Sequence, residues 1–233
     1  MIWISDAWKD YEVLDTSNGE RLERWGKYIL VRPDPQVIWN TPHTAKEWKK
    51  YDARYVRSNT GGGRWTDHDL PERWQIRYKD YLTFNVKPMN FKHTGVFPEQ
   101  AANWDFIRDT VAQASVQRPV RVLNLFAYSG GATLAAAAGG AEVFHVDASK
   151  GMVAWAKETR RPAAWQTGRS IGSWTTVPNL SSGRSAGAGS TTASSWIRPA
   201  MAGAPAVKSG KWRPASSPSW RRLPRSFLMI LCL

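Results

Sequence analysis

Apolar and polar positions follow two different periods between residues 103 and 158. A continuous apolar run is typical of a strand buried on both faces, whereas apolar positions three or four residues apart are typical of a helix. The pattern predicts, in order, a helix over 103–112, a strand over 120–126, a helix over 132–138, a strand over 142–146 closed by Asp147, and a helix over 151–158. This order is the first half of a doubly wound α/β sheet.

In parts of the N-terminal zone, residues 1–87, apolar residues recur at every second position, which is the period of a strand. Apolar residues alternate with polar ones over 74–78 and again over 82–86, which predicts a hairpin, and a further strand over 28–31 ends before Pro33. We therefore expect a small, mostly β domain. Its many Trp and Arg residues could contact RNA, or they could form an aromatic core with a solvated basic face.

Net charge separates the rest of the chain from these two zones. The formal charge of +13 is typical of a nucleic-acid binder, but all 19 acidic residues lie at or before Glu158. The stretch from Thr159 to Leu233 has 11 Lys or Arg residues, no carboxylate and no sustained period, so it carries +11 and the rest carries +2. Its composition predicts a disordered or non-native tail, and RNA binding does not follow from net charge.

Several classes of protein are disfavoured. A single cysteine, Cys232, excludes a disulfide framework and a cysteine-based metal site. The N-terminus has no secretory pattern, and the longest apolar run, 227–233, is too short to span a bilayer. We expect a cytoplasmic protein without metal or membrane association, and the oligomeric state is left open.

The candidate chemistry lies where the strand over 120–126 ends in the turn Ala127–Gly131. Such a turn lets a ligand approach the backbone and the free amides of a helix N-terminus. Asp147 ends the next strand, where a carboxylate can accept hydrogen bonds from ribose hydroxyls. These features predict a nucleoside-cofactor site, although an ordinary turn with a surface Asp would have the same pattern. A nicotinamide dinucleotide is disfavoured, because the first glycine of G-x-G-x-x-G is missing.

Three segments carry a family resemblance: N-L-F-A-Y-S-G-G over 124–131, V-D-A-S-K-G over 146–151 and T-G-V-F-P-E-Q over 94–100. They resemble class I S-adenosylmethionine-dependent methyltransferases, in particular the bacterial 23S rRNA (cytosine-C5) methyltransferase-like family. The resemblance implies a small β-rich domain over 1–87 and the first half of a Rossmann-like methyltransferase domain over 88–158. It also implies an RNA substrate and a role in rRNA processing.

The resemblance also implies S-adenosyl-L-methionine as cofactor. The backbone of the turn would hold its methionine end, Asp147 its ribose, and Ala148 with Ser149 its adenine, while Gln100 would help to seat it. The implied cofactor-binding residues are Gln100, Asn124, Phe126, Ala127, Tyr128, Ser129, Gly130, Gly131, Asp147, Ala148 and Ser149.

The D-P-P-S-Y motif that this family carries further on is missing after Glu158, as is a counterpart for the catalytic cysteine, so the catalytic residues stay unknown. A one-base deletion just after Glu158 would explain this. In the undeleted frame, each codon consists of the third base of one present codon and the first two bases of the next. Because Trp is always TGG, Trp174-Thr175 and Trp196-Ile197 each give an Asp codon. After the second Asp the codons permit Pro-Pro-Ser-Tyr, and Met201-Ala202 then forces Gly.

Residues 159–233 are therefore interpreted as an out-of-frame tail. We expect the chain to fold poorly and to transfer no methyl group, since a random-frame tail would not supply the missing strands. The alternative is a non-catalytic, basic, Trp-rich RNA-binding module. Binding of S-adenosylmethionine would separate the two hypotheses.

Overall fold

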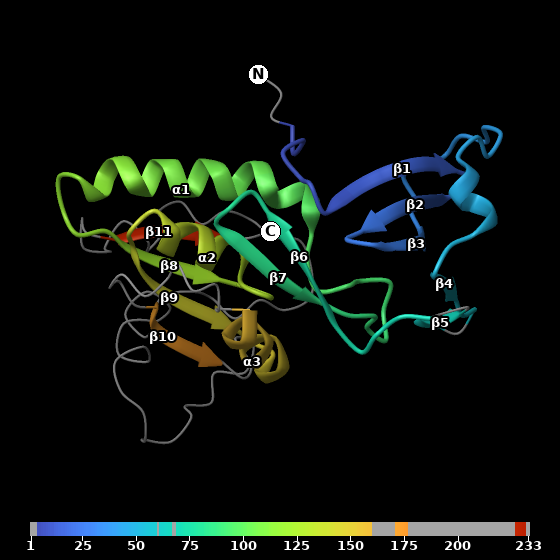
Figure 1. Ribbon diagram of the computed structural model, residues 1–233. Coiled ribbons are helices and arrows are strands. Elements are labelled where there is room, and N and C mark those ends of the chain that lie inside the picture. The colour runs from blue at the N-terminus through green and yellow to red at the C-terminus, as the bar shows by residue number, and fades with distance from the viewer. Residues whose placement is uncertain (1–3, 60, 67–68, 160–170, 177–226, 232–233) are drawn as a thin grey trace, which may run out of the picture. The chain divides into compact units, whose positions relative to one another are not determined.

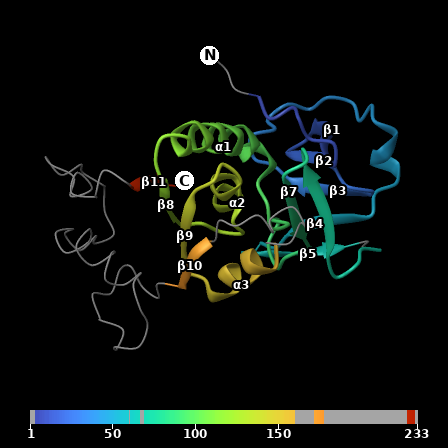
Figure 2. The ribbon, with the colours of Figure 1, turned by 60° about the vertical axis from the view of Figure 1, so that its left-hand side comes forward.

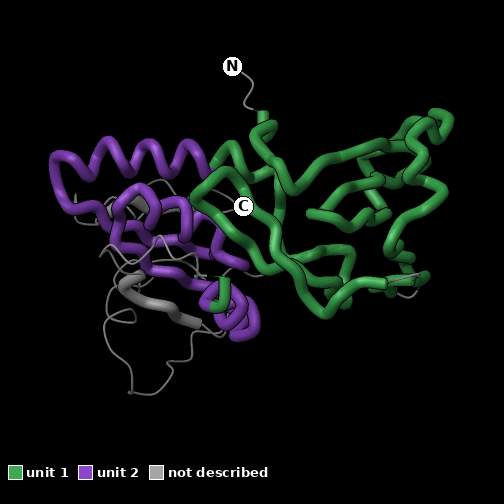
Figure 3. The backbone as a smooth tube through the Cα atoms, viewed as in Figure 1, with its two compact units in different colours: residues 1–103, 158–165 green, residues 104–157, 166–233 purple. Residues whose placement is uncertain are grey.

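The chain forms two compact units in the computed structural model, which describes residues 4–59, 61–66, 69–159, 171–176 and 227–231. Of these, the first unit comprises residues up to 103 together with 158 and 159 (Figure 3). The second unit comprises residues 104–157, drawn purple in Figure 3, and the two strands beyond residue 170, which Figure 1 labels.

The first unit contains a five-stranded sheet in the order β1-β2-β3-β4-β5. All neighbouring pairs are antiparallel except β3 and β4, which are parallel. The β1–β2 hairpin turns at Asn18-Gly19, whose φ angles of 53° and 75° suit this two-residue turn. The strands are β1 Tyr11–Ser17, β2 Glu20–Trp25, β3 Tyr28–Pro33, β4 Ala53–Arg57 and β5 Gly63–Thr66.

A separate hairpin completes the strands of this unit. It joins β6, Trp74–Tyr78, to β7, Leu82–Val86, and Trp74 faces Val86 across the pair. The sequence prediction of this hairpin is confirmed at both ends. Two 3-10 helices, Lys46–Lys49 and Pro98–Gln100, lie in the connections.

Aromatic side chains fill the core of the first unit. Trp25 is fully buried and contacts Tyr11 edge to face at 4.8 Å between ring centroids, while Trp8 lies 4.9 Å from Tyr78. Trp74 donates a hydrogen bond from its indole nitrogen to the carbonyl oxygen of Trp25 at 3.1 Å. For these tryptophans the interpretation as an aromatic core is therefore the better one. Trp39, which is 46% exposed, is an exception.

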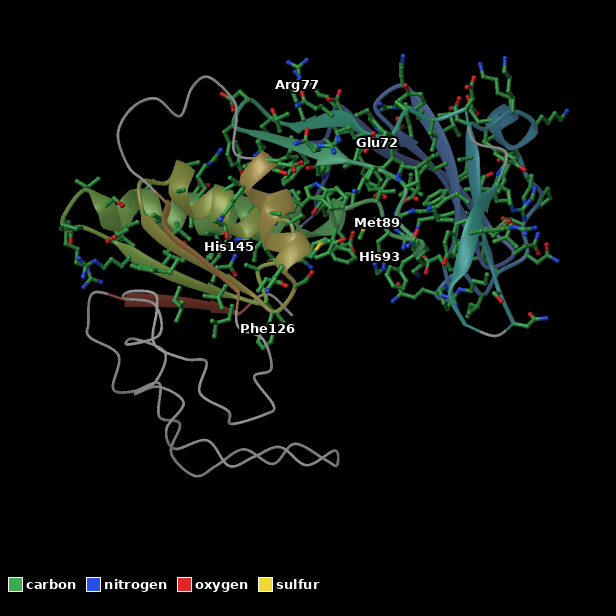
Figure 4. The ribbon with its side chains drawn as sticks, turned by 90° about the horizontal axis from the view of Figure 1, so that it is seen from below. Glu72, Arg77, Met89, His93, Phe126 and His145 are labelled. Atoms are coloured by element: carbon green, nitrogen blue, oxygen red, sulfur yellow. The ribbon has the colours of Figure 1, made fainter. Side chains whose placement is uncertain are left out.

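The second unit contains a parallel sheet in the order β10-β9-β8-β11, visible in Figures 1 and 2. Helix α2 connects β8 to β9, and α3 follows β9. Both connections run in the same direction along the sheet, so right-handed crossovers place α2 and α3 on one face, as Figure 4 shows. The elements are α1 Ala101–Ser115, β8 Arg121–Leu125, α2 Gly131–Ala138, β9 Glu142–Asp147, α3 Lys150–Thr159, β10 Ile171–Thr176 and β11 Phe227–Leu231.

Two strands lie where the sequence predicted none. β10 pairs with β9 and β11 pairs with β8, both in parallel. The apolar run beginning at Phe227 is too short to span a bilayer, but five consecutive apolar residues are long enough for a strand. The remainder of the predicted tail, 160–170, 177–226 and 232–233, lies outside the described residues. No helix in the described part of the chain is long and apolar enough to cross a membrane.

Candidate functional site

The turn between β8 and α2 has a strained backbone. Phe126 and Tyr128 have φ angles of 57° and 51°, in the left-handed region that non-glycine residues rarely adopt, and Gly130 has a φ of 93°. The predicted strand over 120–126 ends one residue early for this reason. Residues held in such conformations cost about 1–3 kcal/mol each and cluster at ligand sites. Two of them lie in one turn at the carboxyl end of a parallel strand, which makes this turn the candidate site.

Asp147 holds this turn in place. Its Oδ2 atom accepts a hydrogen bond from the amide of Tyr128 at 2.8 Å, and its Oδ1 atom accepts one from the amide of Ser149 at 2.8 Å. The amide of Ala127 donates to the carbonyl oxygen of Val146 at 3.1 Å, which continues the link between the two strand ends. Each carboxylate oxygen has two lone pairs, so Asp147 keeps acceptor capacity for hydroxyl groups of a ligand.

The start of α2 offers backbone donors beside that carboxylate. Gly130 precedes the helix and no side chain caps it, although the amide of Leu134 closes the first turn on the carbonyl oxygen of Gly130 at 2.9 Å. A side chain at residue 130 would be strained by its φ, and its Cβ would lie 3.2 Å from the Cβ of Ala156. The absence of a side chain keeps the backbone open to a ligand.

Gly131 has a packing reason of its own. A Cβ at this position would lie 2.7 Å from two ring carbons of Trp104 on α1. Gly139, at the other end of α2, is equally constrained, since its Cβ would lie 2.6 Å from the carbonyl oxygen of Arg108. The two glycines let α2 pack closely on α1, so Gly131 is needed by the fold as well as by the predicted site.

A buried polar network lies beneath the turn. Asn124 donates from Nδ2 to the hydroxyl oxygen of Thr133 at 2.9 Å, and that hydroxyl lies 2.9 Å from Nδ1 of His145. All three side chains are fully buried. The hydroxyl oxygen accepts from Asn124, and the tautomer of the imidazole decides whether it donates to Nδ1 or accepts from it as well. This network joins β8, α2 and β9, and of its three members only Asn124 is among the residues predicted from the sequence.

Acidification is expected to loosen this network. Burial lowers the pKa of His145 to about 4, although the charge of Asp147 acts in the opposite direction. In the unfolded chain the same group titrates near 6.5, so its stabilising effect is complete above about pH 6.5 and is lost as the pH falls toward 4. We expect amide-exchange protection factors in β8 and β9 to fall over this range in the parent chain. In a His145→Gln variant they should fall less, and an equal fall would contradict the prediction.

Most of the predicted residues lie at the carboxyl ends of the neighbouring strands β8 and β9. Ala127 and Ser129 are buried, Phe126 is 52% exposed, and Ala148 and Ser149 are exposed. Ser149 has an additional role, because its hydroxyl accepts a hydrogen bond from the amide of Met152 at 3.2 Å and so caps α3.

Gln100 belongs to the first unit, unlike the other predicted residues. It ends a 3-10 helix, and its side-chain oxygen accepts a hydrogen bond from Asn103 at 2.8 Å. Within the ranges that the structure describes, no group of three or more His, Cys, Asp or Glu side chains could hold a metal ion.

Comparison with solved structures gives the class of fold. The chain is 40% identical to an S-adenosylmethionine-dependent methyltransferase from Agrobacterium tumefaciens, with a TM-score of 0.62, over 69% of this chain and 50% of that one. The chain thus spans half the length of that protein. The fold is an α/β methyltransferase-like fold, as the sequence predicted.

Other solved structures are less similar. A protein from Streptococcus mutans assigned as an S-adenosylmethionine-dependent methyltransferase is 19% identical, with a TM-score of 0.47, over 66% of this chain and 43% of that one. A tRNA (uracil-54, C5)-methyltransferase from Pyrococcus abyssi is 16% identical, with a TM-score of 0.33, over 61% and 36%. No protein-family model matches the chain, and comparison with curated proteins gave no match either.

Proposed function

We propose that this chain is the cofactor-binding part of an S-adenosylmethionine-dependent methyltransferase. The observation that carries the proposal is the Asp147 carboxylate, which bridges the amides of Tyr128 and Ser149 at 2.8 Å each beside a strained turn and an uncapped helix. The likeness to the Agrobacterium tumefaciens methyltransferase supports it. The chain spans half of that protein, so an activity for the whole is part of the proposal.

The residues present fit this cofactor. Spare lone pairs on Asp147 suit the two ribose hydroxyls. The amides of Ala127, Tyr128 and Gly130 are used within the protein, so the first amides of α2 would serve the methionine end. Ala148 and Ser149 are exposed next to Asp147, where an adenine ring would lie. When bound, the cofactor supplies a methyl group on a sulfonium sulfur. The contribution of the chain is to orient that group and to exclude water. Gln100, which belongs to the first unit, stays a prediction from the sequence.

We infer that the acceptor is RNA, of the rRNA class that the motifs of residues 94–151 imply. The chain as written would be inactive, because the D-P-P-S-Y segment is absent from its frame. The loss of every carboxylate at one point and the two forced Asp codons support a frameshift after Glu158. We also propose that the chain consists of a small β-rich domain over 1–87, the first half of the methyltransferase domain over 88–158 and an out-of-frame tail.

Calorimetric titration of the full chain tests the cofactor assignment. We expect S-adenosylmethionine and S-adenosylhomocysteine to bind, and NAD to give no heat, since the turn lacks the first glycine of the dinucleotide fingerprint. RNA binding without S-adenosylmethionine binding would instead favour the non-catalytic RNA-binding module. Binding of NAD alone would contradict both.

A further inference from the structure

A cavity in the first unit lies where two parallel strands separate. β3 and β4 pair only at Leu30–Ala53 and Val31–Arg54. Beyond these positions the strands diverge, and Pro33 and Arg57 line a cavity of about 400 Å³. Proline has no amide hydrogen to continue the ladder, which is a physical reason for the separation.

The carboxylates around this cavity are already paired. Glu20, in the cavity wall, accepts two hydrogen bonds from Nη2 of Arg54 at 2.8 Å, one on each oxygen. Asp34 lies 2.6 Å from an Nη atom of Arg21. The fully buried Glu23 is paired with Arg32 through two hydrogen bonds.

Two cations in this part of the unit have no ion pair within the described residues, although the charge of Asp34 acts on one of them, Lys92. Arg57 is exposed at the cavity wall and has no acidic partner among the residues that the structure describes. Lys92 donates from Nζ to the carbonyl oxygen of Pro33 at 3.3 Å, and it too has no ion pair in the described part of the chain. Burial and the nearby guanidinium of Arg57 lower the pKa of Lys92. Arg57 lines the cavity, Lys92 is bonded to the cavity-lining Pro33, and two neighbouring cations of this kind attract an anion.

Aromatic side chains accompany these cations. Tyr51 and Tyr55 line the cavity, and the hydroxyl of Tyr55 donates to the carbonyl oxygen of Asn90 at 3.4 Å, which fixes the segment that carries Lys92. Phe91 in that segment is 58% exposed. Cations beside aromatic rings are the combination with which proteins bind single-stranded nucleic acid, because bases stack on the rings while the cations neutralise phosphates.

We propose that this cavity binds a backbone phosphate of single-stranded RNA, with Arg57 in its wall and Lys92 beside Pro33 as the cationic partners and Tyr51 available to stack on the adjoining base. The proposal rests on the RNA substrate proposed above and assigns one part of its binding surface. It does not depend on the cofactor turn.

Fluorescence anisotropy with a labelled twelve-nucleotide single-stranded RNA tests the proposal on the full chain. Arg57→Ala and Lys92→Ala should each weaken binding about 3–10-fold, and each should reduce the slope of log K against log salt by about 0.7, the value for one phosphate contact on a single strand. Arg77→Ala is the matched control, because Arg77 is an exposed cation of the same unit that lies well away from His93, the neighbour of Lys92, in Figure 4. The basic tail contributes equally to all variants, so only differences between them are used.

The possible outcomes separate this proposal from the assignment of the cofactor. Affinities and salt slopes of Arg57→Ala and Lys92→Ala equal to those of Arg77→Ala would overturn the RNA site. Inorganic phosphate or a mononucleotide binding as tightly as the RNA would overturn RNA as the occupant. Titration of S-adenosylmethionine on the same variants should be unchanged. If the parent fails to bind S-adenosylmethionine while RNA binding still depends on Arg57, the cofactor proposal fails and this site stands.

Discussion

Insertion of one adenine into the codon of Thr159 is expected to turn an inactive chain into an active methyltransferase. The insertion restores the frame in which Trp196-Ile197 gives Asp, followed by codons that permit Pro-Pro-Ser-Tyr. Transfer of a tritiated methyl group from S-adenosylmethionine to total ribosomal RNA should rise from background to a rate in the ordinary range of enzymes, about 1 per second or more. No other single change to this chain has a larger expected effect.

Controls make this test specific. Insertion of three bases at the same place keeps the present frame and should leave the chain inactive. In the restored chain, Asp147→Asn should reduce the transfer, which links it to the proposed cofactor site. Methyl transfer by the parent chain, or no D-P-P-S-Y in the restored frame of the gene, would contradict the frameshift hypothesis.

Asp147→Asn is the second change with a large expected effect. An amide offers one acceptor oxygen in place of two, so it cannot serve the backbone amides and the ribose hydroxyls together. Hydrogen bonds to a charged group contribute about 1.5–3 kcal/mol, so the Kd for S-adenosylmethionine should rise about 10–100-fold. Calorimetric titration of the variant measures this directly.

The control for this variant is Glu142→Gln at the opposite end of β9. Glu142 pairs with Arg121 at 2.8 Å on the surface, where removing an ion pair has little effect. This variant should bind the cofactor like the parent. Near-ultraviolet circular dichroism should be the same in both variants. A Kd for Asp147→Asn within twofold of the parent would remove Asp147 from the site.

The sequence predicted the elements that have a clear period and a local turn. The hairpin over 74–86 and the succession from β8 to α3 lie within a residue or two of their predicted bounds. In both places most of the apolar residues predicted from the sequence period are ones that the fold buries, and a turn or a glycine bounds the element. The same agreement located the turn at Ala127–Gly131, whereas β8 ends one residue earlier than predicted, at Leu125.

Other elements escaped prediction because burial and polarity disagree in them. β2 buries Glu23 next to Leu22, since Arg32 neutralises the carboxylate from the adjacent strand, and the binary pattern therefore fails. The dipeptide Asn18-Gly19 is a strong sequence signal for a hairpin turn, so the β1–β2 hairpin was predictable from it. The network of Thr133 and His145 beneath the site could not be seen either, because its members come together only through tertiary packing.

The close approach of α2 to α1 has a consequence for how such sites are recognised. The indole of Trp104 leaves no room for a side chain at Gly131, and the backbone of the same residue belongs to the proposed ligand site. A glycine fingerprint drawn from this turn would therefore select domains with a particular helix pairing as strongly as domains with a particular ligand. A descendant that lost the cofactor could keep the fingerprint unchanged for as long as it kept its tryptophan.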